Sequence, residues 1–225
     1  MTTIAFIGSG NIGSTVARLS VAAGHRVVLS NSRGPDTLKD LTAELGPLAT
    51  AVTAEEAARE GDLVVVSVPV KAYPALPRPA GRPVLDAGNY YPQRDGQIAE
   101  LDDRSLTSSG LLQRDLPDAP VVKVFNNIFF RHLASLARPA GAPDRSALPM
   151  AGDDEAAKAA VTAFLDSIGY DAVDAGPLAE SWRQEPGGPA YGAPYGPFSD
   201  QHGTPAGADA LRAALAQARQ APAAS

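Results

Sequence analysis

The sequence predicts an α/β protein with a doubly wound, parallel sheet. Short Val- and Ile-rich runs alternate with amphipathic runs through most of the chain, as strands and helices do in a sheet covered on both faces. The run at 63–68 is continuously apolar and Val-rich, which favours a central strand. A turn with glycines at Gly8, Gly10 and Gly13 lies between the first apolar run and the first helical pattern.

The first half of the chain predicts four strands and three helices. Polar or turn-forming residues separate the apolar runs, and Gly46 followed by a proline ends the second helical pattern. Thr53 and Glu56 have the spacing of a capping box, so a helix should begin there. The strands are expected at 4–7, 26–30, 49–52 and 63–68, and helices at 15–23, at 36–45 and from 53.

The second half predicts two further strands and then a smaller unit. Strands are expected at 82–86 and 121–125, with a loop from Asn89 and a helix at 107–114 between them. A β-α-β arrangement should follow at 147–151, 154–168 and 171–174. We therefore expect a main domain at 1–140 and a small C-terminal extension at 141–225. Within that extension a Pro/Gly-rich, irregular segment at 186–207 precedes a helix at 209–219.

Composition excludes several classes of protein. With 225 residues, the chain is long enough for one domain or one domain plus an appendage. It has no cysteine, so thiol catalysis, disulfides and thiolate metal sites are excluded. A net charge of -6 without a basic run argues against nucleic acid. The absence of a long apolar segment and of a signal-peptide pattern predicts a cytoplasmic protein that does not enter membranes.

The glycine turn predicts a dinucleotide site. Gly8 permits a tight turn, Gly10 lets the backbone approach a pyrophosphate, and Gly13 allows the helix to pack closely on the strand. The N-terminus of the following helix offers free N–H groups and a positive dipole to the phosphates. The alternative is that the three glycines only turn a tight corner.

The end of the second strand favours NADP over NAD. An NAD site usually has an acidic residue here, whereas this chain has Asn31, Ser32 and Arg33, and no acid before Asp36. A guanidinium with hydroxyl and amide donors suits a 2′-phosphate. The alternative is that Arg33 is a solvated turn residue.

These motifs resemble the NADPH-dependent F420 reductase family. The resemblance runs to about residue 180 and includes the glycine turn, the Asn31–Ser32–Arg33 motif, the strand that ends at Pro69, Gly152 followed by two aspartates, and Asp174-Ala-Gly-Pro-Leu. It implies a Rossmann domain with a small C-terminal extension, hydride transfer involving NADPH, and a homodimer. We expect the acceptor to be the deazaflavin coenzyme F420 or a small carbonyl or imine compound.

The resemblance also implies roles for residues. The glycine turn would hold the pyrophosphate, Ser32 and Arg33 the 2′-phosphate, and Val68 and Pro69 would pass beside the nicotinamide ribose. Family members that reduce the coenzyme typically have His where this chain has Asn126, and the chain departs again after Leu178. The expected cofactor-binding residues are Gly8, Ser9, Gly10, Asn11, Ile12, Gly13, Asn31, Ser32, Arg33, Ser67, Val68, Pro69 and Asn89.

Three residues are candidates for catalysis. Asn89 and Asn126 follow strand ends, so their amides should point into the cleft, either to orient the nicotinamide or a substrate oxygen or, equally, to cap turns. Lys123 interrupts an apolar strand and is either a proton donor or the partner of a buried carboxylate. His132 is a minor candidate on a helix.

No metal site is expected, because the histidines lack ligand spacing and Asp153 with Asp154 is better explained by helix capping.

Two questions remain open from the sequence. The aromatic residues of the Pro/Gly-rich segment, from Tyr191 to Phe198, close over an apolar or planar substrate, reach across the cleft of a dimer partner, or belong to an unstructured tail. The leading interpretation is that the protein is an NADP(H)-dependent oxidoreductase, an enzyme. The alternative is a catalytically silent NADP(H)-binding sensor, which the missing family His favours.

Overall fold

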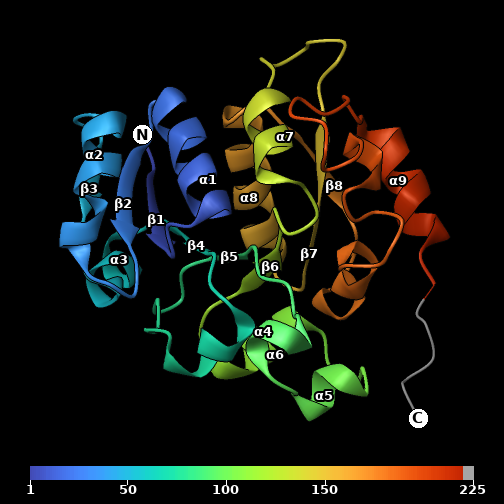
Figure 1. Ribbon diagram of the computed structural model, residues 1–225, viewed down its shortest axis with the longest axis horizontal. Coiled ribbons are helices and arrows are strands. Elements are labelled where there is room, and N and C mark those ends of the chain that lie inside the picture. The colour runs from blue at the N-terminus through green and yellow to red at the C-terminus, as the bar shows by residue number, and fades with distance from the viewer. Residues whose placement is uncertain (220–225) are drawn as a thin grey trace.

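A computed structural model describes residues 1–219, and its centre is one continuous sheet (Figure 1). Within these residues the sheet has eight strands in the order β3-β2-β1-β4-β5-β6-β7-β8. The strands are β1 (Thr3–Ile7), β2 (Arg26–Ser30), β3 (Ala49–Ala51), β4 (Leu63–Val66), β5 (Val84–Asp86), β6 (Val121–Lys123), β7 (Ala147–Gly152) and β8 (Asp171–Asp174).

The first six strands are parallel and have the doubly wound order, which confirms the predicted fold class. The order reverses between β1 and β4, so a crevice is expected there at the carboxyl ends of the strands. β7 runs antiparallel to β6, and β8 is parallel to β7. The predicted β-α-β unit thus extends the same sheet, and the domain boundary at residue 140 stays a prediction.

Helices cover both faces of the sheet. The longer helices are α1 (Asn11–Ala22), α2 (Lys39–Leu45), α3 (Ala54–Glu60), α6 (Ser108–Asp115), α7 (Phe130–Ser135), α8 (Glu155–Ser167) and α9 (Ala208–Gln217). Short turns of helix are α4 (Pro92–Asp95), α5 (Ala99–Asp102), η1 (Pro35–Leu38), η2 (Val70–Ala75), η3 (Leu178–Gln184) and η4 (Ala193–Tyr195).

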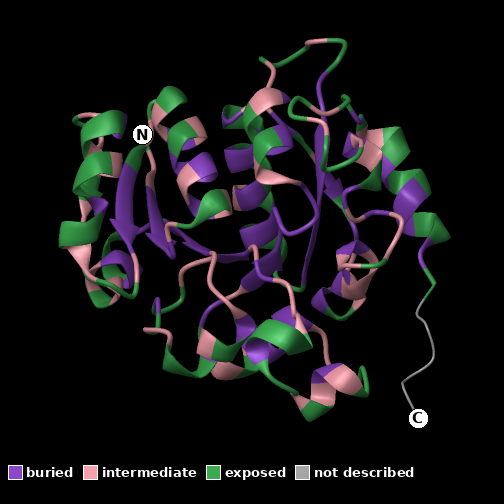
Figure 2. Ribbon diagram, viewed as in Figure 1, coloured by how far each residue is buried: buried purple, intermediate pink, exposed green. Residues whose placement is uncertain are grey.

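Two apolar cores lie on opposite faces of the sheet, because successive strand residues point to opposite sides. The central strands between them are buried (Figure 2). In β1, Ile4 and Phe6 belong to the core that includes α1, α7 and α8, whereas Ala5 and Ile7 belong to the core that includes α3 and α6. Both faces of β1 and β4 are therefore buried, as the continuous apolar runs predict.

Several element boundaries differ from the sequence-based expectation. The first helix begins at Asn11, directly after Gly10, so that Gly13 lies in its first turn, and not at residue 15. The pattern at 36–45 is divided into η1 and α2. The sixth strand ends at Lys123, because Phe125 has a φ of 67° and the chain turns away. The capping box at Thr53 and Glu56 is confirmed.

The Pro/Gly-rich segment is irregular but packed against the domain. The hydroxyl of Tyr195 is buried and donates to the carbonyl of Ala147 in β7 at 2.8 Å. The backbone N–H of Gly192 donates to the carbonyl of Asn127, also at 2.8 Å. The segment therefore docks over β7 and the loop before α7. No helix within residues 1–219 has the length and apolar character needed to cross a membrane.

Candidate active site

The glycine turn has the geometry that a dinucleotide requires. Gly8 has a φ of 102°, and a Cβ there would collide with the carbonyl of Ser67. A Cβ on Gly13 would collide with the carbonyl of Gly8, so both positions require glycine. Gly10 precedes α1 as its N-cap and faces open space. Since α1 has no side-chain cap and no acid in its first turn, its free N–H groups remain available to phosphates.

The glycine turn is held against the end of β2. The backbone N–H of Gly8 and the hydroxyl of Ser9 both donate to the carbonyl of Ser30, at 3.0 and 2.9 Å. Asn31 shapes the next loop, since its side-chain oxygen accepts from the N–H of Arg33 and its amide donates to Thr37. Ser32 and Arg33 are exposed beside this turn. The predicted phosphate-binding residues thus lie on adjoining loops at the carboxyl edge of the sheet.

A cleft of about 380 Å³ opens at the same edge. It brings together eight of the predicted site residues: Gly10, Asn11, Ile12, Ser67, Val68, Pro69, Asn89 and Asn126. Gly8 and Gly13 lie beneath it, and the 31–33 loop lies outside its lining. Lys123 does not line the cleft, because its side chain is fully buried behind Gly88.

Asn89 and Asn126 hold each other across the cleft floor. The Asn126 amide donates to the Asn89 side-chain oxygen at 3.0 Å and to the carbonyl of Gln184 at 2.8 Å. The side-chain oxygen of Asn126 accepts from Gln184 at 2.9 Å. Asn89 in turn donates to the carbonyl of Asn126. Asn126 is buried and its amide makes all these bonds within the protein, so it aligns two loops and η3.

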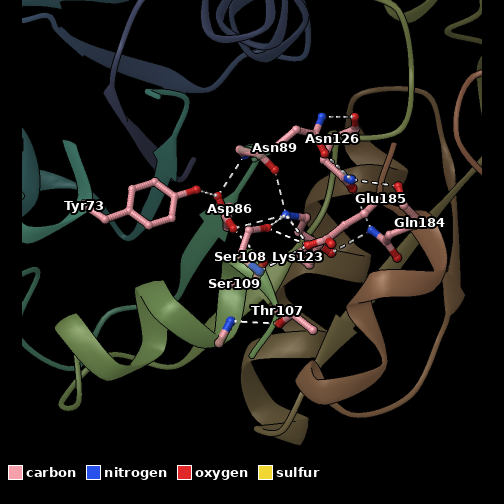
Figure 3. Close-up of polar contacts among 12 residues, drawn as sticks. Tyr73, Asp86, Asn89, Thr107, Ser108, Ser109, Lys123, Asn126, Gln184 and Glu185 are labelled. Atoms are coloured by element: carbon pink, nitrogen blue, oxygen red, sulfur yellow. Dashed lines mark hydrogen bonds and ion pairs between the residues drawn. The ribbon is translucent and has the colours of Figure 1, made fainter. Parts of the chain in front are cut away.

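Lys123 lies at the centre of a buried polar network (Figure 3). Its ammonium donates to the carbonyl of Gly88 at 2.6 Å and to the hydroxyl of Ser108 at 2.7 Å. The carboxylates of Asp86 and Glu185 lie 3.5 and 3.7 Å away. Of the two sequence-based interpretations of Lys123, the structure thus places it beside the buried carboxylate of Asp86 and the partly buried carboxylate of Glu185, where its charge is compensated.

Asp86 connects the same network to the cleft through Gly88, which lines the cleft. Its carboxylate accepts from the hydroxyls of Tyr73 and Ser109 and from the N–H of Gly88, at 2.7, 2.6 and 2.8 Å. Burial, and then the Asp86 charge, raise the pKa of Tyr73 well above its ordinary value, so the phenol stays protonated and donates. The network therefore fixes both backbone groups of Gly88, next to Asn89.

The outer wall of the cleft is aromatic. Tyr91, Phe129 and Phe130 line it from the loop before α4 and from the start of α7. Tyr191 and Phe198 line it from the Pro/Gly-rich segment, and their rings pack edge to face with centroids 6.1 Å apart. The Phe198 ring is 5.5 Å from that of Phe129. The aromatic segment thus lines one side of the cleft and is docked, not an unstructured tail.

Sequence reasoning missed Tyr91 and Arg94 as cleft residues. The guanidinium of Arg94 lies 5.0 Å from the centroid of the Tyr91 ring, donates to the carbonyl of Asn89 at 2.6 Å and pairs with Asp95. The available signal was the position of both residues just after Asn89, at the end of a strand beside the cleft.

The remaining candidates have structural contacts. His132 is fully buried on α7, and its ring bonds the carbonyl of Asp200. Asp154 caps α8 by accepting from the N–H of Ala157, and Asp153 accepts from the N–H of Leu178. In the part of the chain that the structure describes, no three His, Asp or Glu side chains are grouped to hold a metal ion.

Comparisons with known proteins agree with this arrangement. A family model described as NADP oxidoreductase, coenzyme F420-dependent, matches residues 3–90. The protein YjhV of Escherichia coli (strain K12) is 42% identical over 53 residues, which are 24% of this chain and 39% of YjhV.

Two solved structures extend the similarity. The hypothetical protein SMa0349 of Sinorhizobium meliloti superposes with a TM-score of 0.70 and 30% identity, over 83% of this chain and 91% of that one. A proposed F420-dependent NADP reductase from Arthrobacter sp. FB24 gives a TM-score of 0.66 at 24% identity, over 80% of this chain and 87% of that one, and this shows the shared fold.

Proposed function

Because the chain belongs to the family of coenzyme F420-dependent NADP oxidoreductases, we propose that its cleft binds NADPH and presents the nicotinamide to a planar acceptor. The family consists of NADP-dependent oxidoreductases, which confirms the predicted enzyme class. The observation that supports this proposal is the cleft itself, which joins the glycine turn at one end to an aromatic wall at the other.

The nicotinamide half would lie between Val68, Pro69 and Asn89. These residues follow the carboxyl ends of β4 and β5. Both ends lie beside the point between β1 and β4 where the strand order reverses. In hydride transfer the protein mainly positions the two reactants, because the reactive group belongs to the cofactor. Asn89 is held by Asn126 and, through Gly88, by Lys123, so these three candidates form one positioning unit.

NADPH would be preferred to NADH. Arg33 and Ser32 are exposed on the loop that follows β2, adjacent to the glycine turn that meets the end of β2. Arg33 makes no ion pair with any carboxylate of residues 1–219, so its charge is available to a 2′-phosphate. The first acid on this loop, Asp36, pairs with Lys39.

The acceptor is either a deazaflavin coenzyme of the F420 type or a small planar carbonyl or imine compound. Five aromatic rings line the outer cleft, and such surfaces stack on planar acceptors.

We further propose a homodimer in the cytoplasm. Analytical ultracentrifugation at several protein concentrations tests the dimer, and fractionation of the native cells tests the location.

Mixing the protein with NADPH and F420, and following the absorbance of both, tests the proposal. We expect NADPH to be oxidised as F420 is reduced. Tight NADPH binding without transfer to F420 or to any planar carbonyl or imine in a substrate screen would instead support the silent sensor.

A further inference from the structure

We propose that Tyr91 is the proton donor to the acceptor and that Tyr191, from the Pro/Gly-rich segment, holds its hydroxyl in place. The inference rests on the proposed function, because it assigns the group that completes hydride transfer in the same cleft. Neither tyrosine lies in the stretch that matches the family model, which ends at residue 90.

The two hydroxyls meet in the cleft. The oxygens of Tyr91 and Tyr191 are 2.8 Å apart, although the residues are 100 positions apart in the chain. Both line the cleft together with Pro69 and Asn89. The Tyr191 ring packs edge to face with that of Phe198, and the backbone N–H of the next residue, Gly192, donates to the carbonyl of Asn127. The Pro/Gly-rich segment therefore holds the Tyr191 hydroxyl beside that of Tyr91 in the cleft.

Other polar side chains of the cleft are occupied or lie elsewhere. The amide of Asn126, at the family His position, bonds to Asn89 and Gln184. Ser67 lies against the glycine turn, with its hydroxyl 3.3 Å from the place of a Cβ on Gly13, which is the cofactor side of the cleft. Lys123 is enclosed behind Gly88. The tyrosine pair is the hydroxyl source on the acceptor side.

The surroundings assign different roles to the two phenols. The Arg94 guanidinium lies 5.0 Å from the centroid of the Tyr91 ring and pairs with Asp95, whose carboxylate also accepts from the backbone N–H of Tyr91, so the Tyr91 ring is held in place at the cleft. Burial, and then the hydrogen bond to Tyr91, raise the pKa of Tyr191. Tyr191 therefore stays protonated and can donate to the Tyr91 oxygen as that oxygen becomes a phenolate.

The step balances with the proposed substrates. A hydride leaves NADPH, which becomes NADP⁺, and forms a C–H bond at the acceptor. The carbon that accepts it is the carbonyl or imine carbon of a small compound, or the ring carbon of a deazaflavin that is conjugated with the ring imine. The π electrons move to the carbonyl oxygen or to the imine nitrogen, directly or through the conjugated double bonds. The O–H bond of Tyr91 breaks, and its proton forms the new O–H or N–H bond. The Tyr91 phenolate accepts from Tyr191 and regains a proton from water when the product leaves.

The test compares three Tyr→Phe variants in full-length protein. NADPH oxidation is measured with F420 and with phenanthrenequinone as acceptors, and NADPH binding by calorimetry. We expect Tyr91→Phe to lower kcat by about 10²- to 10⁴-fold, the usual contribution of a positioned acid, while the Kd for NADPH changes little. Tyr191→Phe should lower kcat less than Tyr91→Phe does. It should also increase the solvent deuterium isotope effect on kcat, because proton transfer from Tyr91 becomes slower when Tyr191 no longer donates to its oxygen. Tyr195→Phe is the matched control, because its hydroxyl bonds to Ala147 away from the cleft, and should leave kcat unchanged.

The outcomes separate this inference from the proposed function. A Tyr91→Phe variant that turns over as the wild type does would overturn the assignment of Tyr91 and leave the oxidoreductase standing. Equal losses of kcat in Tyr191→Phe and Tyr195→Phe, with equal losses of stability, would overturn the positioning role of Tyr191. A wild-type protein that binds NADPH but reduces neither probe, nor any planar carbonyl or imine in the substrate screen, would overturn both the inference and the proposed function.

Discussion

The amide of Asn126 donates to the side-chain oxygen of Asn89 at 3.0 Å, and this bond joins the loops that follow β5 and β6 at the floor of the cleft. Both side chains are at strand ends, where the parallel order of the sheet directs them to one edge. Asn126 also binds Gln184, so the same amide links these two loops to η3.

Replacement of Asn126 by Ala should affect both stability and cofactor binding. The change leaves groups of Asn89 and Gln184 without partners, which should lower the free energy of unfolding by about 1–3 kcal/mol. It should also raise the KM for NADPH, because Asn89 loses its orientation. Chemical denaturation and steady-state kinetics measure the two effects.

Asn127→Ala is the control for this prediction. The Asn127 amide is also buried, but it bonds to Ala190 and does not line the cleft, so the variant should lose stability and keep the KM. A KM that rises equally in both variants would mean that Asn126 acts only through global stability.

Arg33→Ala tests the preference for NADPH. Removal of a charged hydrogen bond to the 2′-phosphate should weaken NADPH binding by about 1.5–3 kcal/mol, with little change for NADH. Calorimetry with both nucleotides gives the difference directly. Arg59→Ala makes the same charge change on the exposed end of α3 and should leave both affinities as they are. Equal losses for NADPH and NADH in Arg33→Ala would contradict the assignment.

Lys123→Met should destabilise the protein strongly. The substitution leaves the Asp86 carboxylate buried without its cation, and breaking a buried pair in this way typically costs about 3–5 kcal/mol. Asp86→Asn in the same chain removes the uncompensated charge and should restore part of the loss. Urea unfolding of the two single variants and of the double variant gives the coupling free energy between Lys123 and Asp86. Additive losses in the double variant would show that the two charges do not interact.

The raised pKa of the buried Tyr73 hydroxyl leads us to expect a loss of folding stability at alkaline pH. Its folded-state pKa is raised, while in the unfolded chain it ionises near the ordinary value of about 10. Its contribution to stability is therefore complete below pH ~10 and is lost as the pH rises above that value. Tyr73→Phe should be less stable at neutral pH and should decline less steeply in alkali. Parallel slopes for the two proteins in urea unfolding at alkaline pH would show that Tyr73 ionises normally in the fold.

The sequence was most informative where one local pattern determines one structure. The turn from Gly8 to Gly13, the capping box at Thr53 and the apolar run of β4 each depend on neighbouring residues, and each was predicted in place. Strand ends were less accurate, because the turn at Phe125 depends on packing and not on a glycine or proline signal.

The acceptor side of the cleft could not be predicted in the same way. It depends on contacts between distant residues, such as Tyr91 with Tyr191 and Asn126 with Gln184, and a single sequence does not contain these pairings. For the same reason the sequence identified Lys123 as unusual but left open which carboxylate compensates its charge.

Binding of NADPH at the glycine turn is the central claim, and Gly10→Ala tests it most directly. A Cβ at this position meets open space, so the variant should fold with unchanged stability, whereas Gly8→Ala collides with Ser67. A methyl group at residue 10 would nevertheless stand where the pyrophosphate approaches the backbone. In calorimetric titrations, we expect wild-type protein to bind NADPH and Gly10→Ala to bind it at least about tenfold more weakly, a loss of about 1.4 kcal/mol. Equal affinities, or no heat from the wild type, would contradict the account.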